Sequence, residues 1–231
     1  ISADAAASKR DIGYVSEEMR LFPTATLEWH MQFVARVFGA WDTAYAASLL
    51  KRFDLRPAQQ VKGLSHGQRI KAALLLALAR RPRLLVLDEP TTGLDPVARQ
   101  EVIGALTEAV QDEARTVLFS SQNTLDVEQI ADRITFIDRG RIVDADDKEH
   151  FLDRWRRIRL ELPANGVLPQ AANVVASQVS GRTATLTTDR YSEALVASCQ
   201  AAGASVHAID RMTLEEIFVV SVMTRRDGVL A

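Results

Sequence analysis

The chain is poor in the features that mark secreted, membrane-spanning and nucleic-acid-binding proteins. It has a single cysteine, Cys199, so no internal disulfide can form, which fits a reducing compartment. No apolar run approaches the ~20 residues that span a bilayer, and no signal peptide is apparent. Neither charge dominates, since 28 Lys and Arg stand against 30 Asp and Glu, so nucleic acid is not the expected partner. These features favour a cytoplasmic globular protein, for which any attachment to a membrane would be through another protein.

The sequence also contains no phosphate-binding loop of the form GxxxxGK[ST]. In such a loop, backbone N–H groups cradle the phosphates of a nucleotide, and the lysine reaches the β- and γ-phosphates. None of the lysines of this chain follows a glycine; they are Lys9, Lys51, Lys62, Lys71 and Lys148. As printed, the polypeptide is therefore not expected to bind a nucleotide well by itself.

The most informative stretch that is present runs LLVLDEPTTGLDP over residues 84–96. Its apolar start stops at two adjacent carboxylates, Asp88 and Glu89. A continuous apolar run without alternation predicts a strand that is buried on both faces of a parallel sheet. Open α/β sheets bind ligands at the carboxyl ends of their strands, and one carboxylate can hold Mg²⁺ while its neighbour orients a water. The stretch therefore indicates nucleotide hydrolysis.

LSHGQ (residues 64–68) precedes this stretch, and the order LSHGQ, LLVLDEP, GLDP closely resembles the ATP-binding subunit of ABC transporters. The resemblance implies a P-loop NTPase fold with ATP and Mg²⁺ as ligands. It implies that Asp88 holds Mg²⁺, that Glu89 activates water and that Asp95 lies across a dimer interface. It also implies that the signature loop binds the ATP of the opposite subunit, through Ser65, His66, Gly67 and Gln68.

The resemblance extends in both directions from these motifs. IGYVSEE (residues 12–18) resembles the segment that enters the family's Q-loop, with Glu17 where glutamine is usual. Residues 116–143 resemble the family's strand, H-loop and closing hairpin, with Gln122 where a histidine usually contacts the γ-phosphate. MTLEEIF (residues 212–218) resembles the C-terminal extension of ABC-2-type exporter ATPases. The resemblance therefore implies an exporter subunit whose nucleotide site includes Glu17 and Gln122.

The departures from the family pattern affect the expected activity. Gln122 can donate a hydrogen bond but cannot carry a positive charge, which puts hydrolysis at this site in doubt. His66 replaces a glycine where the backbone approaches phosphate, although as imidazolium it would add a favourable charge. The family's P-loop lies upstream of Ile12. We expect an N-terminally truncated ATPase rather than a protein without the loop, because a free start here would expose a strand and the apolar face that it should cover.

The sequence predicts an N-terminally truncated ABC ATPase domain over residues 1–150 and a small α+β accessory domain over residues 151–231. A helical subdomain is expected at about residues 24–81, and in the family this part touches the membrane-spanning subunit. Trp29, Phe33 and Trp41 are expected in the core, although exposed aromatic residues near residues 19–26 would instead mark a groove for a partner.

Local signals predict where individual elements begin. Thr26 is expected to cap a helix, and Asp95 followed by Pro96 is expected to begin another. Thr213 and Glu216 have capping-box spacing. The Asp-rich residues 144–147 suggest a solvated connector between the domains, with metal binding as an alternative. Further elements are expected as helices at 68–81 and 192–202, strands at 116–121 and 205–209, a hairpin at 134–143 and two strands within 174–186.

The leading interpretation is the ATP-hydrolysing subunit of an ABC-2-type exporter, peripheral on the inner face of the cell membrane. Its expected partners are ATP, a membrane-spanning permease subunit, and a second copy or a paralogous ATPase. The alternative is a catalytically weak regulatory partner that supplies LSHGQ in trans to another subunit's ATP. The absent P-loop and Gln122 favour this alternative, whereas the intact Asp88, Glu89 and Asp95 argue against it. A third class, ABC ATPases that act on DNA or ribosomes, usually carries coiled coils or paired cassettes, and neither appears in the sequence.

Overall fold

The structure, a computed structural model, describes residues 9–163 and 173–226. Its contacts divide the chain into two compact units, Ile1–Ile130 and Ala131–Ala231. This division falls earlier in the chain than the domain boundary expected near residue 150, because the hairpin that follows residue 130 groups with the C-terminal unit. The boundary of the ATPase domain at residue 150 stays a prediction. Within the described ranges, no helix is long and apolar enough to cross a membrane.

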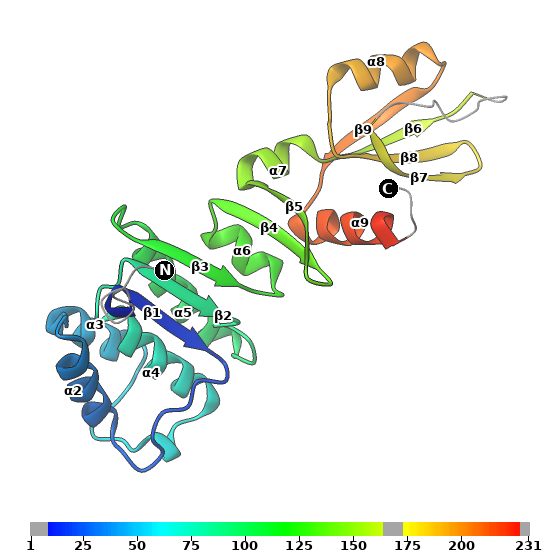
Figure 1. Cartoon of the computed structure of the whole chain (residues 1–231). Coiled ribbons are helices and arrows are strands. Elements are labelled where there is room, and N and C mark those ends of the chain that lie inside the picture. The colour runs from blue at the N-terminus through cyan, green and yellow to red at the C-terminus, as the bar shows by residue number, and fades with distance from the viewer. Residues whose placement is uncertain (1–8, 164–172, 227–231) are drawn as a thin grey trace. The chain divides into compact units, whose positions relative to one another are not determined.

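The N-terminal unit is built on a three-stranded parallel sheet in the order β1-β2-β3 (Figure 1). The strands are β1 (Ile12–Ser16), β2 (Leu84–Asp88) and β3 (Thr116–Ser120). Their register sets Ser16 opposite Asp88 and Asp88 opposite Ser120. The last residues of all three strands therefore meet at one edge of the sheet, as expected for parallel strands joined by helical crossovers.

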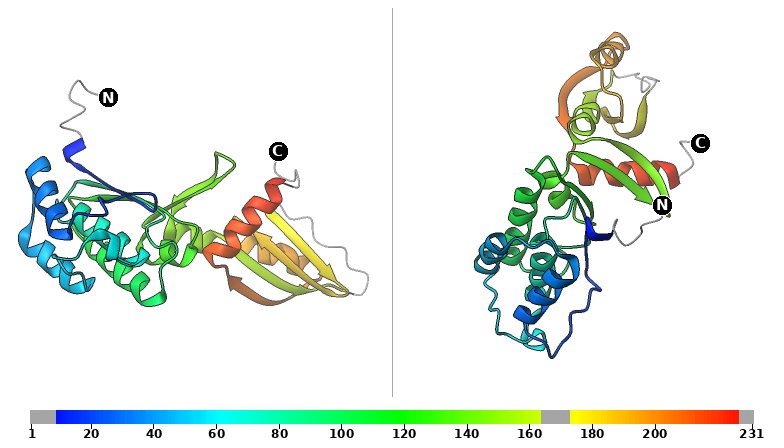
Figure 2. Two further views of the ribbon diagram at one scale, coloured as in Figure 1. Left: turned by 90° about the horizontal axis from the view of Figure 1, so that it is seen from below. Right: turned by 60° about the vertical axis from the view of Figure 1, so that its left-hand side comes forward.

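Two of the described helices of this unit begin where the sequence predicts caps, whereas the helix expected at residues 68–81 begins earlier, at His66. The side chain of Thr26 accepts a hydrogen bond from the backbone of Trp29, and Asp95 caps a helix that has Pro96 in its first turn. The core lies between α4, α5 and the sheet, and α4 contacts β1 (Figures 1 and 2). The bounds are α2 (Leu27–Phe38), α3 (Thr43–Arg52), η1 (Val61–Gly63), α4 (His66–Leu78), α5 (Pro96–Val110) and α6 (Thr124–Ile130).

Among the described residues, a covering layer lies on only one face of the parallel sheet, so the prediction of strands buried on both faces is wrong for these residues. Along β2, Leu85 and Leu87 are buried, whereas Leu84 and Val86 are only half-buried. On β1 and β3, Tyr14 is 52% exposed and Leu118 62% exposed. A continuous apolar run does not distinguish a strand covered on one face from a strand covered on both. The run shows that the strand is apolar, but it does not show which elements pack against it.

The aromatic residues of the helical subdomain are more exposed than a core position allows. Trp29 is 44% exposed and Phe33 46% exposed, so the expectation that these two lie in the core is wrong, whereas Trp41 is partly buried and packs against the core. Phe22, in the turn region before α2, is 60% exposed. Phe22 contacts Trp29 edge-on at 5.6 Å between ring centroids, and Trp29 stacks on Phe33 at 5.2 Å. These rings form one exposed cluster, the outcome that the sequence associates with a partner groove.

The C-terminal unit combines a hairpin, three helices and a four-stranded antiparallel sheet in the order β7-β8-β6-β9 (Figures 1 and 2). The expected capping box is present: Glu216 N–H donates to the Thr213 hydroxyl, and Thr213 N–H donates to the Glu216 carboxylate. Cys199 is fully buried in the core of this unit. The bounds are β4 (Arg133–Asp138), β5 (Arg141–Asp147), α7 (Lys148–Arg154), β6 (Arg156–Glu161), β7 (Val174–Ser180), β8 (Thr183–Thr188), α8 (Glu193–Ala201), β9 (Ser205–Arg211) and α9 (Leu214–Arg226).

The Asp-rich stretch at residues 144–147 is not the solvated connector expected from its composition. It forms the end of β5, where Asp144 and Asp146 both pair with Arg154 of α7. Within the described ranges, no group of His, Cys, Asp and Glu side chains is placed to hold a metal ion. The carboxylates therefore belong to a cluster of ion pairs. The composition of the segment alone does not distinguish such a cluster from a charged linker.

Candidate functional site

The carboxyl edge of the parallel sheet gathers the predicted site residues from three distant segments. Glu17 follows β1 and is exposed; Asp88 ends β2 and is followed by Glu89; Gln122 lies two positions beyond the end of β3 and is exposed. Because Ser16, Asp88 and Ser120 are in register, the three segments leave the sheet side by side. This is where open α/β sheets bind their ligands.

Ser120 connects Asp88 at the end of β2 to Glu89 just after it, and sequence reasoning missed it. Its hydroxyl donates a 2.5 Å hydrogen bond to Asp88 Oδ1. Its hydroxyl and carbonyl oxygens lie 3.3 Å and 3.2 Å from the backbone nitrogen of Glu89, which donates to them. The signal that could have found it is register, because Ser120 is the β3 residue that stands opposite Asp88. The hydroxyl fixes the direction of the Asp88 carboxylate.

Glu89 occupies a strained backbone position. Its φ of +50° lies in the left-handed region that a residue with a Cβ rarely adopts. Two sets of contacts hold it there: its backbone bonds to Ser120, and a 2.7 Å hydrogen bond from the Thr92 hydroxyl to Glu89 Oε2. Such outliers cost on the order of 1–3 kcal/mol and concentrate at functional sites. The strain turns the carboxylate out of the strand direction immediately after Asp88.

The LSHGQ loop begins α4 and lies against the loop that follows Glu89. Ser65 and Gln68 form a reciprocal capping box, so their side chains satisfy each other's backbone N–H groups. His66 Nε2 lies 3.3 Å from the carbonyl oxygen of Thr92. A Cβ added at Gly67 would meet the Leu94 side chain at 3.3 Å, so the two loops approach closely there and Leu94 would have to shift by a few tenths of an ångström. The first turn of α4 thus leaves backbone N–H groups and partial positive charge at its N-terminus.

Asp95 acts within its own chain as a helix cap. Its Oδ1 accepts hydrogen bonds of 2.9 Å from the backbone N–H groups of Val97 and Ala98. These bonds, with that from Ala98 the largest contribution, hold the pKa of Asp95 below its usual value. The carboxylate therefore stays ionised at the start of α5. Neither of these bonds uses Oδ2.

The donor set at the sheet edge fits a hard divalent cation. One oxygen of Asp88 is engaged by Ser120, and within the described ranges its Oδ2 has no hydrogen-bond partner. Carboxylate oxygens are the ligands that Mg²⁺ uses in nucleotide sites, where it keeps waters and binds substrate phosphates as well. The residues therefore fit Mg²⁺ on one side. The phosphate cradle of a P-loop is not among them, because the printed sequence holds no such motif.

Comparisons with known proteins agree with this geometry. The ABC transporter family model matches residues 2–92. The chain belongs to the ABC transporter family of ATP-binding domains. It is 26% identical over 152 residues to the ABC transporter ATP-binding protein YtrB of Bacillus subtilis, covering 66% of this chain and 52% of YtrB. It is 33% identical over 192 residues to the daunorubicin resistance ATP-binding protein DrrA3 of Streptomyces coeruleorubidus, covering 76% of this chain and 60% of DrrA3. The chain spans about half the length of the curated relatives that it matches.

Solved structures of ABC ATP-binding subunits share the fold. One such subunit aligns with a TM-score of 0.58 at 25% identity, covering 65% of each chain. The dimeric ATP-binding cassette MJ0796 in a post-hydrolysis state with ADP and phosphate aligns with a TM-score of 0.55 at 22% identity, covering 64% of this chain and 68% of that one. The second likeness concerns the fold alone. Together they confirm the α/β P-loop NTPase fold predicted for this ABC domain.

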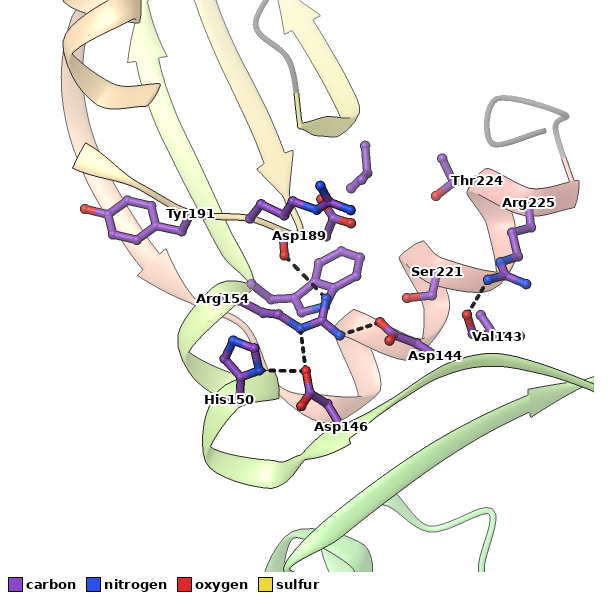
Figure 3. Close-up of a pocket in the computed structure, with 13 residues that line it drawn as sticks. Val143, Asp144, Asp146, His150, Arg154, Asp189, Tyr191, Ser221, Thr224 and Arg225 are labelled. Carbon is purple, nitrogen blue, oxygen red and sulfur yellow. Dashed lines mark hydrogen bonds and ion pairs between the residues drawn. The ribbon is translucent and has the colours of Figure 1, made fainter. Parts of the chain in front are cut away.

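The C-terminal unit of this ABC chain has a separate pocket of about 650 Å³ (Figure 3). Arg154 lies at its centre: its guanidinium donates to Asp144 Oδ2 at 2.6 Å, to Asp146 Oδ2 at 3.2 Å and to the Asp189 carbonyl at 3.4 Å. His150 Nδ1 lies 2.8 Å from Asp146 Oδ2. Carboxylates and guanidinium groups both line this space, so the pocket offers no single sign of charge to a ligand.

Proposed function

We propose that this chain is the ATP-binding and ATP-hydrolysing subunit of an ABC-type exporter, and that it couples ATP-driven dimer closure to transport by a separate membrane subunit. The observation that carries the proposal is the Asp88–Glu89 pair at the carboxyl edge of the sheet, oriented by Ser120. Glu17 and Gln122 leave the same edge from the neighbouring strands. Membership of the ABC transporter family supports reading this edge as the hydrolysis site.

Each carboxylate has a separate role in the proposed site. Asp88 Oδ2 would hold Mg²⁺, which supplies charge neutralisation for the phosphates when it is bound. Glu89 lies beside it with its side chain steadied by Thr92, which suits a general base that orients the attacking water. Gln122 would donate a hydrogen bond to the γ-phosphate in place of the usual histidine. Glu17 would take the place of the Q-loop glutamine.

The signature loop would serve the ATP of a second subunit. Ser65 and Gln68 order the first turn of α4, so its N-terminal N–H groups form an anion site. His66 adds an imidazole beside them, and Asp95 at the start of α5 would meet the partner across the interface. The dimeric cassette MJ0796 with ADP and phosphate shows a fold of this kind as a pair, which supports a dimer here.

The exposed aromatic cluster of Phe22, Trp29 and Phe33 would be the docking surface for the membrane-spanning permease. Its rings are 44–60% exposed although they pack against each other, which is unusual for a surface without a partner. It lies in the segment that follows Glu17, so a movement at the nucleotide edge would reach it through a short stretch of chain. Docking there would place the subunit on the inner face of the cell membrane.

Export rests on a short resemblance. The matched relatives include a linearmycin resistance ATP-binding protein of Bacillus subtilis, 30% identical and covering 62% of this chain, and also the molybdenum import protein ModC of Rhodospirillum rubrum, 30% identical and covering 78%. These relatives do not separate export from import. The tail segment MTLEEIF at residues 212–218 is what favours the exporter.

The first test is the coding DNA immediately upstream of Ile1, followed by ATP hydrolysis with the full-length protein. An in-frame strand followed by GxxxxGK[ST] and Mg²⁺-dependent turnover would support the proposal. Glu89→Gln should lower turnover at least about a hundredfold, because an amide cannot act as a base but can still accept from Thr92. A start codon at Ile1, or turnover that survives Glu89→Gln, would contradict the proposal that this chain itself hydrolyses ATP.

The regulatory alternative has its own test in a mixed dimer. Ser65→Arg would be placed on this chain only, and ATP turnover by an intact partner ATPase would be measured. If the chain works mainly by supplying LSHGQ in trans, the partner's turnover should be lost while the chain's own site stays silent. If the chain is itself an ATPase, its own Glu89-dependent turnover should persist when the partner's site is disabled.

The docking surface is tested with the permease that is expressed together with the full-length subunit. Trp29→Ser with Phe33→Ser should abolish co-purification of the two subunits in detergent. The matched control is Val179→Ser on β7, which removes an equally exposed apolar side chain from the C-terminal unit. Equal retention of the permease by both variants would contradict the assignment of the surface.

A further inference from the structure

A buried carboxylate on α6 joins three parts of the proposed nucleotide site. Asp126 is only 1% exposed. Its Oδ2 accepts a 2.7 Å hydrogen bond from the Thr91 hydroxyl, and its Oδ1 accepts from Nε and Nη2 of Arg99, both at 2.7 Å. Thr91 is itself buried, at 6% exposure. Each carboxylate oxygen is therefore committed to a different segment of the chain.

The three partners belong to functionally distinct segments. Thr91 lies two residues after Glu89, in the loop that runs on to Asp95. Arg99 lies in the first turns of α5, the helix that Asp95 caps. Asp126 lies in the first turn of α6, which follows directly from the loop that holds Gln122. Asn123 ties that loop to the helix, because its carbonyl accepts from the backbone N–H of Asp126.

An ion pair is not needed merely to hold α5 and α6 together. A buried ion pair loses much of its Coulomb energy to desolvation, and apolar side chains of similar volume often stabilise a fold equally well. What the carboxylate adds is defined geometry, since charge-assisted hydrogen bonds are short and directional. A shift of Thr91 by 1 Å would break its bond to Asp126. The network thus sets the position of the 91–95 loop relative to the loop of Gln122.

We propose that Asp126 is a positioning residue of the ATPase site, which acts through Thr91 and Arg99 to hold the loop between Glu89 and Asp95 in register with the Gln122 loop. This inference rests on the proposed ATPase function. Because Glu89 and Asp95 flank the held loop, Asp126 links the residue that activates water to the residue that faces the second subunit. ATP closure across the dimer would then be transmitted to the base through this network.

The kinetic test uses the full-length protein with Thr91→Val and with the double variant Arg99→Met, Asp126→Met. Thr91→Val removes one hydroxyl, and the double variant removes both charges without leaving either one buried alone. Both are expected to lower kcat for ATP hydrolysis about tenfold or more while KM for ATP changes less than about threefold, since small misplacements cost mainly chemistry. The conservative Arg99→Lys should retain an intermediate kcat. A thermal melt of each variant shows whether it is still folded, so that a lower kcat in a folded variant can be assigned to the displaced loop.

A matched control removes a carboxylate from an exposed ion pair of the same unit. Glu108→Gln breaks the 2.8 Å pair with Arg52, whose two side chains are 46% and 39% exposed. Exposed pairs of this kind contribute little, so kcat should stay at the wild-type value. If the control lowers kcat as much as Thr91→Val does, the buried network has no special role and the inference is overturned.

Hydrogen–deuterium exchange supplies a readout that does not depend on turnover. In both variants, the amides of residues 91–95 should exchange at least about fivefold faster than in the wild type, whereas those in the middle of α5 should not change. Wild-type exchange at 91–95, or wild-type kcat in the folded double variant, would overturn the inference. A wild-type protein without ATPase turnover would instead refute the proposed function, and exchange would still decide whether Asp126 holds the loop.

Discussion

The Ser120 hydroxyl donates to Asp88 Oδ1 at 2.5 Å while the backbone nitrogen of Glu89 donates back to the same hydroxyl. One small side chain on β3 therefore orients the proposed metal ligand and the backbone of the proposed base together. Both bonds cross between neighbouring parallel strands. Their geometry is set by sheet register, which changes little when side chains elsewhere are altered.

Ser120→Ala should lower the affinity of the site for Mg²⁺ while it changes the stability of the fold little. Without the hydroxyl, the Asp88 carboxylate can rotate, and the loss of such a supporting hydrogen bond typically costs about 10–100-fold in metal affinity or activity. The measurement is ATP turnover of the full-length protein against Mg²⁺ concentration. The control is Thr107→Val, which removes a hydroxyl that donates to the Ile103 carbonyl within α5. An unchanged Mg²⁺ titration for Ser120→Ala would contradict the role.

Gly93→Ala and Gly104→Ala should change stability in opposite directions. Gly93 has φ of +70°, and a Cβ built there would lie 3.1 Å from His66 Nε2, so alanine is strained and pushes on the signature loop. Gly104 lies within α5 with nothing within 4 Å of a built Cβ. We expect a loss of about 1 kcal/mol at Gly93 and a gain of up to about 1 kcal/mol at Gly104 in the free energy of unfolding by urea. Equal signs for the two variants would show that the left-handed backbone at Gly93 is not required.

Gln122→His should raise kcat for ATP hydrolysis by about tenfold. Gln122 is exposed at the sheet edge, where an imidazole can enter without displacing packed atoms and can carry a positive charge toward the γ-phosphate. Single-turnover hydrolysis by the full-length protein gives the rate directly. The control Gln129→His places the same side chain on an exposed position of α6 and should leave the rate unchanged. A lower rate for Gln122→His would mean that glutamine is matched to this site by some other contact.

The C-terminal unit should lose stability on acidification through Asp146. The hydrogen bond from His150 is the largest effect that holds the pKa of Asp146 below its ordinary value of 3.8. A carboxylate with a lowered folded-state pKa stabilises the fold above its unfolded pKa, and that contribution is lost as pH falls through the folded value. The loss should therefore occur below about pH 4.

The matching variant is His150→Gln, followed by thermal melting between about pH 2 and pH 5. Removing the His150 bond should move the acid-induced fall in melting temperature to higher pH. His207→Gln serves as the control, because His207 pairs with Glu161 at 3.3 Å in the same unit and does not touch Asp146. Superimposable acid profiles for His150→Gln and the wild type would contradict the assignment.

Signals local in the chain predicted the elements well. Thr26 and Asp95 cap helices as expected, because a cap depends on residues three positions apart. The capping box of Thr213 and Glu216 is confirmed for the same reason. The Asp88–Glu89 pair falls at the end of β2, since an apolar run that stops at carboxylates marks where a strand leaves the core.

Features that depend on distant packing were not predictable from the sequence. Ser120 and Asp126 contact residues that lie about thirty or more positions away, and a lone serine or aspartate gives no local sign of that. Burial of both faces was wrongly expected for β2, and Trp29 and Phe33 were wrongly expected in the core. In each case the residue type indicates that the side chain tends to avoid water. Whether the side chain is buried depends on which other element covers it.

The placement of β1 beside β2 has a consequence for biosynthesis. In the described part of the chain, Ile12–Ser16 pairs with Leu84–Asp88, so α2, α3 and α4 must all leave the ribosome before the β1–β2 pairing can form. During that interval Val15, which is buried in the folded unit, lacks its β2 neighbour Leu87. Because closing so long a loop is slow relative to helix formation, α2–α4 would be ordered before β1 pairs with β2. Slow translation between residues 16 and 84 would therefore prolong exposure to chaperones and to aggregation.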